Sequence, residues 1–259
     1  MAETCLLVIP SFRDAARLRP FLLDLIATLG RDFSIRISDD GSGGTEQRDL
    51  VRLIEETRGC LRADGPVLMD PILAPRNGGK GAAVYAGWRA ASEATVLAFA
   101  DADGAVGAAE VLRLWHRLKT GAPGGVDALF ASRILKLGRQ VDRRATRHYA
   151  GRIFATCVSQ FTGVRVYDSQ CGLKFVRRDA FEVIDPFLQA SRLAFDVELM
   201  LALVAGGFRI EEAAVDWRDV PGGSVSILRH AAPMLLEVAG IRDRLRRCGG
   251  EILARRKNG

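Results

Sequence analysis

A short apolar run that ends in two acids constrains this chain more than any other feature. Residues 94–104 read ATVLAFADADG, and the part from Ala94 to Ala100 has the composition of a strand buried on both faces of a sheet. Asp101 and Asp103 follow it. Open α/β sheets bind ligands at the carboxyl ends of their strands, and two carboxylates on alternate residues can hold one Mg²⁺ or Mn²⁺. The run therefore favours an α/β fold with an acidic site at a strand end, although the same residues would also fit a solvated turn.

Strands and helices alternate along the chain as far as about residue 120, which indicates an α/β fold with a mainly parallel central sheet flanked by helices. We expect the other strands, in chain order, at Cys5–Pro10, Phe33–Ser38, Pro66–Leu73, Val126–Ala131 and Phe208–Trp217. The stretch Tyr167–Lys174 reads as a polar turn, and Phe195 opens an apolar helix. We expect one domain at 1–220 and a C-terminal basic amphipathic helical tail at 221–259.

Four loops at the predicted strand ends carry polar side chains. They are Ser11–Asp14, Asp39–Gly44, Arg76–Gly81 and Asp101–Gly104. In a parallel sheet these loops meet at one edge. The third is a glycine-rich loop with a lysine at the start of a helix, which suits phosphate, although it is neither a Walker loop nor a dinucleotide fingerprint. Together the loops offer groups for a base, a ribose, a diphosphate and a metal ion, and they predict a site for a nucleoside diphosphate.

Composition sets the broad class of the protein. The 259 residues are 48% hydrophobic and 26% charged, which is ordinary for a globular protein. No apolar run approaches the roughly 18 residues that span a bilayer, and no signal peptide is expected. The five cysteines lack CxxC spacing, which indicates neither a disulfide framework nor a zinc site. We expect a cytoplasmic protein, with peripheral attachment to the inner face of the membrane as the alternative.

The net charge of +6 is unevenly distributed. Seven Lys or Arg and one Asp lie between Arg133 and Arg152, and eight Lys or Arg and three acids lie from Arg229 to the end. Two basic patches on an acidic body indicate anionic partners, or two solvated helix faces. The tail helix could equally lie on an anionic membrane surface or pack against the domain. Nucleic acid is not expected, because the acids at the strand ends would repel its backbone.

At this level of detail the sequence resembles a known family. The stretches that carry the resemblance are VIPSFRDAARL, SDDGSGGT, RNGGKGAAVYAG, FADADGA, ASR, DSQCGLKFVRRDA, and AFDVELMLAL with VDWRDV. They resemble the inverting glycosyltransferases of family 2, above all the dolichyl-phosphate β-glucosyltransferase branch, beside the dolichyl-phosphate mannose synthases. The resemblance extends from about Leu6 to about Val238. It implies a GT-A fold and metal-dependent transfer of a hexose, with UDP-glucose as the expected donor, Mg²⁺ or Mn²⁺ as cofactor and a polyprenyl phosphate as acceptor.

The resemblance also implies roles for individual residues. Base and ribose would be held by Pro10, Phe12, Asp14 and Asp39 or Asp40. Lys80 would lie near the diphosphate, and Asp101 and Asp103 would form the DxD motif that binds the metal, with Asp103 the more direct ligand. An anionic acceptor would meet Arg133, Arg147, Gln170 and Lys174. Asp196 would lie beneath the sugar at a helix start.

Several alternatives remain open on the sequence. Asp196 is the candidate base if the acceptor is a hydroxyl compound, and otherwise it could be a helix N-cap. A lipid phosphate is already anionic and needs little help from a base. The chain has Phe12-Arg13-Asp14 where the family commonly has Tyr-Asn-Glu, which puts base selectivity in doubt. It also has Gly223-Ser224-Val225 where the branch often has Gly-Ser-Lys, which weakens the inference about the acceptor there. A soluble hydroxyl acceptor and a non-catalytic scaffold are the alternative functions, and the oligomeric state is not predicted.

Overall fold

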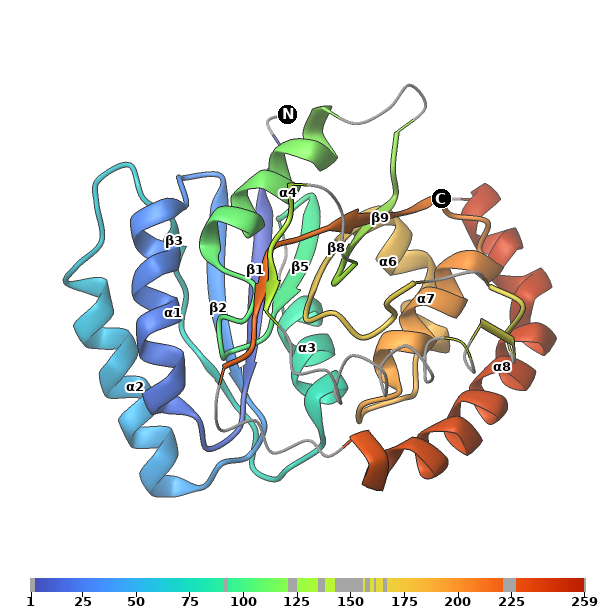
Figure 1. Ribbon diagram of the computed structural model, residues 1–259, viewed down its shortest axis with the longest axis horizontal. Helices are drawn as coiled ribbons and strands as arrows, with labels where there is room; N and C mark the ends of the chain where they lie inside the picture. Colours follow the sequence, from blue (N-terminus) through green and yellow to red (C-terminus); the bar gives the residue numbers. More distant parts are fainter. Residues whose placement is uncertain are drawn as a thin grey trace.

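The chain folds around one central sheet with helices on both sides (Figure 1). The structure, a computed structural model, describes residues 3–90, 93–120, 125–134, 138–142, 156, 159–160, 162–164, 167–220 and 227–258. In this part of the chain eight strands form the sheet in the order β3-β2-β1-β5-β8-β6-β9, and β4 also pairs with β2. The strands are β1 (Cys5–Ser11), β2 (Phe33–Asp39), β3 (Val67–Leu68), β4 (Ile72–Leu73), β5 (Val96–Ala100), β6 (Ala128–Ser132), β8 (Leu173–Arg177) and β9 (Ile210–Ala214).

The sheet is mainly parallel, as predicted. Each pairing along it is parallel except those of β8, which lies antiparallel between β5 and β6. Phe99 of β5 pairs with Lys174 of β8, and Lys174 also pairs with Phe130 of β6. The antiparallel strand therefore brings Lys174 to the middle of the sheet, next to the strand that ends in Asp101.

Three sequence predictions about strands were wrong in detail. Lys174 was expected in a polar turn but belongs to β8, whose residues Leu173 to Val176 are all buried. The segment 66–73 forms the two short strands β3 and β4, because Pro71 between them cannot donate to a sheet. The segment 208–217 is not one strand: Ile210–Ala214 form β9, and Trp217 begins β10 (Trp217–Arg218), which pairs with β7 (Val141–Asp142) in a separate two-stranded sheet.

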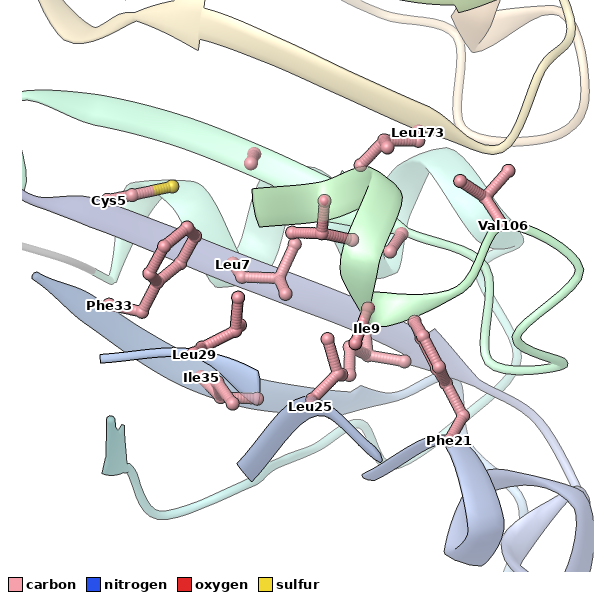
Figure 2. Packing of buried hydrophobic residues seen from close by; sticks show 14 of the residues in the cluster. Cys5, Leu7, Ile9, Phe21, Leu25, Leu29, Phe33, Ile35, Val106 and Leu173 are labelled. Atoms are coloured by element: carbon pink, nitrogen blue, oxygen red, sulfur yellow. The ribbon is translucent and has the colours of Figure 1, made fainter. Parts of the chain in front are cut away.

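Successive side chains along a strand point to opposite faces of the sheet, so the core forms two clusters, one on each face. Cys5, Leu7 and Ile9 of β1 face α1 (Ala15–Thr28), α2 (Gly44–Arg58) and α4 (Ala108–Thr120). Figure 2 shows Leu7 among Leu25, Leu29 and other members of this cluster. Leu6 and Val8 point to the other face, which is covered by α3, α6, α7 and α8. These helices span Lys80–Arg89, Arg178–Ile184, Phe195–Ala205 and Ile227–Asn258, and the 3-10 turn η1 (Asp185–Phe187) follows α6.

The C-terminal helix α8 lies along the outside of this second layer (Figure 1). From Met234 onwards its buried residues lie three, four or seven positions apart, as on one face of a helix. They are Met234, Val238, Ile241, Leu245 and Ile252, and all belong to the same cluster as the α7 side chains. Along the part of the chain that the structure describes, no helix is both long enough and apolar enough to cross a bilayer.

Candidate active site

The polar loops that follow β1, β2, β4 and β5 meet at one edge of the sheet. Asp40 joins three of them, because its N–H donates to the Ser11 carbonyl at 2.8 Å and its carboxylate accepts from the glycine-rich loop. The donors are the Asn77 side chain at 2.8 Å, the Gly78 N–H at 2.7 Å and the Gly79 N–H at 2.9 Å. The predicted convergence of these loops is therefore confirmed, and Asp40 is one of the residues that hold them together.

The neighbouring Asp39 shapes its own loop. Its buried carboxylate accepts from the N–H groups of Gly41 and Ser42, each at 3.0 Å, from the Ser42 hydroxyl, and from Gln47 Nε2 at 2.7 Å. Gly41 has a φ of 73°, and a Cβ there would lie 2.2 Å from the Arg76 carbonyl carbon, so only glycine fits. Asp39 and Asp40 both organise the loops, and direct contact of either carboxylate with a nucleotide stays a prediction.

The loop after β1 presents an aromatic ring to solvent. Phe12 is 42% exposed, and the Arg13 guanidinium lies 5.1 Å from the centre of its ring. Arg13 has a φ of 52°, which is uncommon for a residue other than glycine. Pro10 is the residue of β1 that pairs with Ser38. The ring is exposed, and its contact with a nucleobase stays a prediction.

Asp101 and Asp103 lie at the carboxyl end of β5, and each faces a cation. Lys80 Nζ is 2.6 Å from Asp101 Oδ1, and Arg17 Nη2 is 3.4 Å from Asp103 Oδ2. Arg17 also pairs with Asp14 at 3.3 Å. Burial and the charge of Asp101 raise the pKa of Asp103, and burial raises that of Asp14 against the opposing effect of Arg17. Asp101 and Asp103 therefore each have a positively charged side chain beside them.

The carboxylate oxygens of Asp101 and Asp103 are suitable ligands for a divalent cation. The side chains of Asp101 and Asp103 are 40% and 27% exposed, so both carboxylates can still be reached from solvent. Among the described residues no cluster of three or more His, Cys, Asp or Glu forms a metal site. Hard cations such as Mg²⁺ are commonly bound by one or two carboxylates, with phosphate and water oxygens as the remaining ligands.

Asp196 lies in the first turn of α7 and is bound by lysines. Lys174 Nζ is 2.5 Å from Asp196 Oδ1, and Lys80 Nζ is 4.0 Å from Asp196 Oδ2. The N-cap position of α7 is Ala194, and no side chain caps it, so the N-cap interpretation of Asp196 is wrong. Asp196 is only 3% exposed. Its carboxylate is therefore a buried counter-ion between two ammonium groups.

Lys174 is fully buried, which differs from its predicted contact with an acceptor. Its ammonium also donates to the Cys171 carbonyl at 2.9 Å and lies near the rings of Phe99 and Phe130, 5.2 and 5.1 Å from their centres. A lysine without exposed surface cannot receive an acceptor directly from solvent. The structure gives Lys174 an internal role, which is to hold Asp196 in place.

Arg133 is also paired inside the protein. Its Nε and Nη2 donate to the Asp168 carboxylate at 2.6 and 2.7 Å. Burial alone would raise the pKa of Asp168, but Arg133 lowers it to about 2. Gln170 donates to Met234 Sδ of α8 at 3.4 Å, and Arg147 lies outside the described residues. The acceptor-binding roles of these residues stay predictions.

Sequence reasoning missed two residues of the site. Arg17 lies one helical turn after Asp14, and that spacing is the only signal for it. Gly172 lies against Asp101, because a Cβ on it would be 2.1 Å from Asp101 Oδ2, and its carbonyl accepts from the Asp101 N–H at 2.8 Å. The glycine between Cys171 and Leu173 marks a close approach of this kind, but the sequence does not say to what.

A mainly parallel sheet with paired acids and a glycine-rich loop at one edge is the architecture of the GT-A glycosyltransferases, and this protein is a glycosyltransferase with that fold. The pattern of glycosyl transferase family 2 matches residues 6–185, and the chain belongs to that family.

Curated relatives include several dolichyl-phosphate β-glucosyltransferases. The *Saccharomyces cerevisiae* protein is 27% identical over 91% of this chain and 73% of its own length. The human protein is 26% identical over 84% of this chain and 68% of its own length. The chain spans 65% of the length of a *Trichomonas vaginalis* relative, at 26% identity.

A solved structure supports the assignment of the fold. Glucosyl-3-phosphoglycerate synthase from *Mycobacterium tuberculosis*, in complex with Mn²⁺, UDP-glucose and phosphoglyceric acid, superposes with a TM-score of 0.63 at 15% identity. The match covers 92% of this chain and 80% of that one. At this identity the likeness concerns the fold alone.

Proposed function

We propose that this protein transfers glucose, with inversion, from UDP-glucose to the phosphate of a polyprenyl phosphate. We choose a nucleotide sugar as the donor because of the charged groups at one edge of the sheet, where Lys80 faces Asp101 and Arg17 faces Asp103. The names of the curated relatives supply the sugar and the lipid phosphate, and a solved GT-A structure was obtained with UDP-glucose and Mn²⁺.

The choice of acceptor depends on the contacts of Asp196 with two lysines. A general base must be free to accept a proton from the acceptor hydroxyl. Asp196 is buried, Lys174 is bonded to one of its oxygens at 2.5 Å, and Lys80 faces the other at 4.0 Å. A buried carboxylate that has an ammonium group at each oxygen is poorly placed to take a proton from an acceptor. A phosphate monoester is already an anionic nucleophile and needs none, so this geometry favours a lipid phosphate over a hydroxyl compound.

The residues of this chain then act mainly by position and charge. Phe12 stacks on the base, and Lys80, at the start of α3, receives the diphosphate, because the Gly78 and Gly79 N–H groups of the glycine-rich loop are already bonded to Asp40. Asp101 and Asp103 would hold Mg²⁺ or Mn²⁺, which would neutralise the charge that grows on the departing diphosphate. Lys80 adds a second positive charge on that side. We place Asp196 beneath the sugar, as the resemblance to the family implies, with Lys174 holding its carboxylate.

The first test is an assay of transfer with matched acceptors. UDP-glucose, GDP-mannose and other nucleotide sugars are supplied with Mn²⁺ or Mg²⁺ and with a short polyprenyl phosphate, the corresponding polyprenol, or 3-phosphoglycerate. The polyprenol differs from the lipid phosphate only in the phosphate group. Comparing the two therefore tests whether the protein can use a hydroxyl acceptor, which needs a base. We expect metal-dependent transfer from UDP-glucose to the lipid phosphate and none to the polyprenol.

Two variants control this assay. Asp103→Ala removes one of the two carboxylates proposed for the metal, and we expect transfer to fall by at least 100-fold. Asp49→Ala changes an exposed acid on α2 and should leave the rate unchanged. Transfer to a hydroxyl acceptor instead would refute the argument from Asp196, and no turnover of any donor would favour the non-catalytic scaffold.

A further inference from the structure

Lys80 is held in a position that nucleotide binding alone does not explain. Its ammonium lies 2.6 Å from Asp101 Oδ1 and 4.0 Å from Asp196 Oδ2. Its Nζ also lies near two aromatic rings, 5.0 Å from the centre of Phe99 and 5.5 Å from that of Phe195. The side chain is 21% exposed. The ammonium thus contacts one of the two carboxylates proposed as metal ligands.

The backbone that carries Lys80 has little freedom to move away. Gly79 has a φ of 101°, and a Cβ on it would lie 2.6 Å from the Ser191 carbonyl oxygen. The Ala82 N–H donates to the same oxygen at 2.9 Å, and a Cβ on Gly81 would lie 2.5 Å from the Cβ of Phe195. The start of α3 is packed tightly on the segment before α7. Only the flexible side chain of Lys80 is therefore able to change partners.

We propose that Lys80 is the exchangeable counter-ion of Asp101 and makes the binding of metal and of nucleotide interdependent. Without nucleotide, its ammonium neutralises Asp101 and repels a divalent cation from that carboxylate. When a nucleoside diphosphate binds, the ammonium transfers to the diphosphate and leaves Asp101 to the cation. This inference rests on the proposed donor site, and it assigns Lys80 a function beyond holding phosphate.

Arg17 is in a similar position on the other acid but is a weaker competitor. Its Nη2 is 3.4 Å from Asp103, and it shares its charge with Asp14 at 3.3 Å. Lys80 has the shorter contact, and its second carboxylate, Asp196, is already bonded to Lys174. The exchange is therefore expected mainly at Lys80.

The experiment measures Mn²⁺ binding by titration calorimetry, alone and with saturating UDP, and UDP binding with and without Mn²⁺. For the unaltered protein we expect each ligand to raise the affinity of the other by about 10-fold or more, by the same factor in both directions. In Lys80→Met, Mn²⁺ alone should bind several-fold more tightly than to the unaltered protein, and the mutual effect should shrink by a similar factor. Lys80→Arg keeps the charge and should retain most of the interdependence.

The experiment includes a control variant at a lysine away from the site and a replacement for Lys80→Met in case that variant does not fold. Lys119 lies 3.2 Å from Asp32 and 4.8 Å from the centre of the Trp115 ring, at the amino edge of the sheet, so Lys119→Met removes a similar lysine away from the site. It should change neither affinity. Lys80→Gln, which can still donate hydrogen bonds, replaces Lys80→Met if thermal melting shows that the latter is unfolded.

Two results separate this inference from the proposed function. If Lys80→Met binds Mn²⁺ alone no more tightly than the unaltered protein, while UDP binding weakens, Lys80 is only a diphosphate ligand and the inference is refuted. If UDP does not bind the unaltered protein at all, the proposed donor is wrong. The comparison of Mn²⁺ affinities without nucleotide then still decides whether Lys80 screens Asp101.

Discussion

Replacement of Gly172 by alanine should disable the acid pair without unfolding the protein. A Cβ on Gly172 would lie 2.1 Å from Asp101 Oδ2 and 2.3 Å from its Cγ, whereas ordinary contacts begin at 3.4 Å. The backbone cannot easily separate, because the Asp101 N–H donates to the Gly172 carbonyl at 2.8 Å. The carboxylate of Asp101 must therefore turn aside by about 1 Å, and its Cβ, which would lie 2.9 Å from the new one, must shift slightly as well. A displacement of that size at a reacting centre can cost about 100-fold in rate.

The size of the effect can be checked in three measurements. We expect kcat/KM for transfer from UDP-glucose to fall by about 100-fold, which is about 2.7 kcal/mol of lost transition-state stabilisation. Mn²⁺ affinity measured with UDP should fall as well, because the displaced carboxylate is a proposed ligand. Thermal melting should shift only slightly, since the Gly172 backbone lies outside the left-handed region and the displaced carboxylate is 40% exposed.

A second glycine serves as the control. A Cβ on Gly250 of α8 would meet nothing within 4 Å. Gly250→Ala should leave kcat/KM unchanged and stabilise the helix by about 0.5–1 kcal/mol. If Gly172→Ala retains kcat/KM and Mn²⁺ affinity within about threefold of the unaltered protein, Asp101 does not need its present position and the reasoning fails.

Two further predictions concern buried ion pairs. The pKa of Asp168 is about 2 beside Arg133 and about 4 in an unfolded chain, so the pair stabilises the fold above pH 4 by about 3 kcal/mol, and that contribution is lost as the pH falls from 4 to 2. Urea unfolding at several pH values should show this loss, and Asp168→Asn should abolish it. Arg244→Met leaves the buried carboxylate of Glu198 without its charged partner, and we expect a loss of about 3 kcal/mol in unfolding free energy. A loss below about 1 kcal/mol would show that the N–H groups bonded to Glu198 suffice.

Local patterns predicted the parts of the site that follow directly from a strand end. The apolar run before Asp101, the alternation of strands with helices and the position of Lys80 at the start of a helix all depend on residues close in sequence. The side-chain period of a strand and the geometry of a parallel sheet are enough to bring their loops together. The hydrogen bonds that Gly78 and Gly79 of the glycine-rich loop donate to the Asp40 carboxylate agree with that expectation.

The partners of the buried charges could not be predicted in the same way. Lys174 lies in β8, where Lys174 itself, Arg177 and the polar turn before the strand hid the apolar residues Leu173, Phe175 and Val176. Its ion pair with Asp196 joins residues from β8 and α7, and the close approach of Gly172 to Asp101 joins segments about 70 positions apart. Contacts of this kind depend on the order of strands in the sheet, for which a single sequence carries no local signal.

The sequence by itself determined a mainly parallel α/β fold, the acids at the end of one strand and a loop suited to phosphate, because these follow from short-range periodicity and residue type. Only the tertiary structure decided that Lys80 faces Asp101 and that Asp196 is bound between two lysines. The physical reason is that a buried charge must be paired by whatever the fold places beside it, and the antiparallel insertion of β8 places Lys174 there.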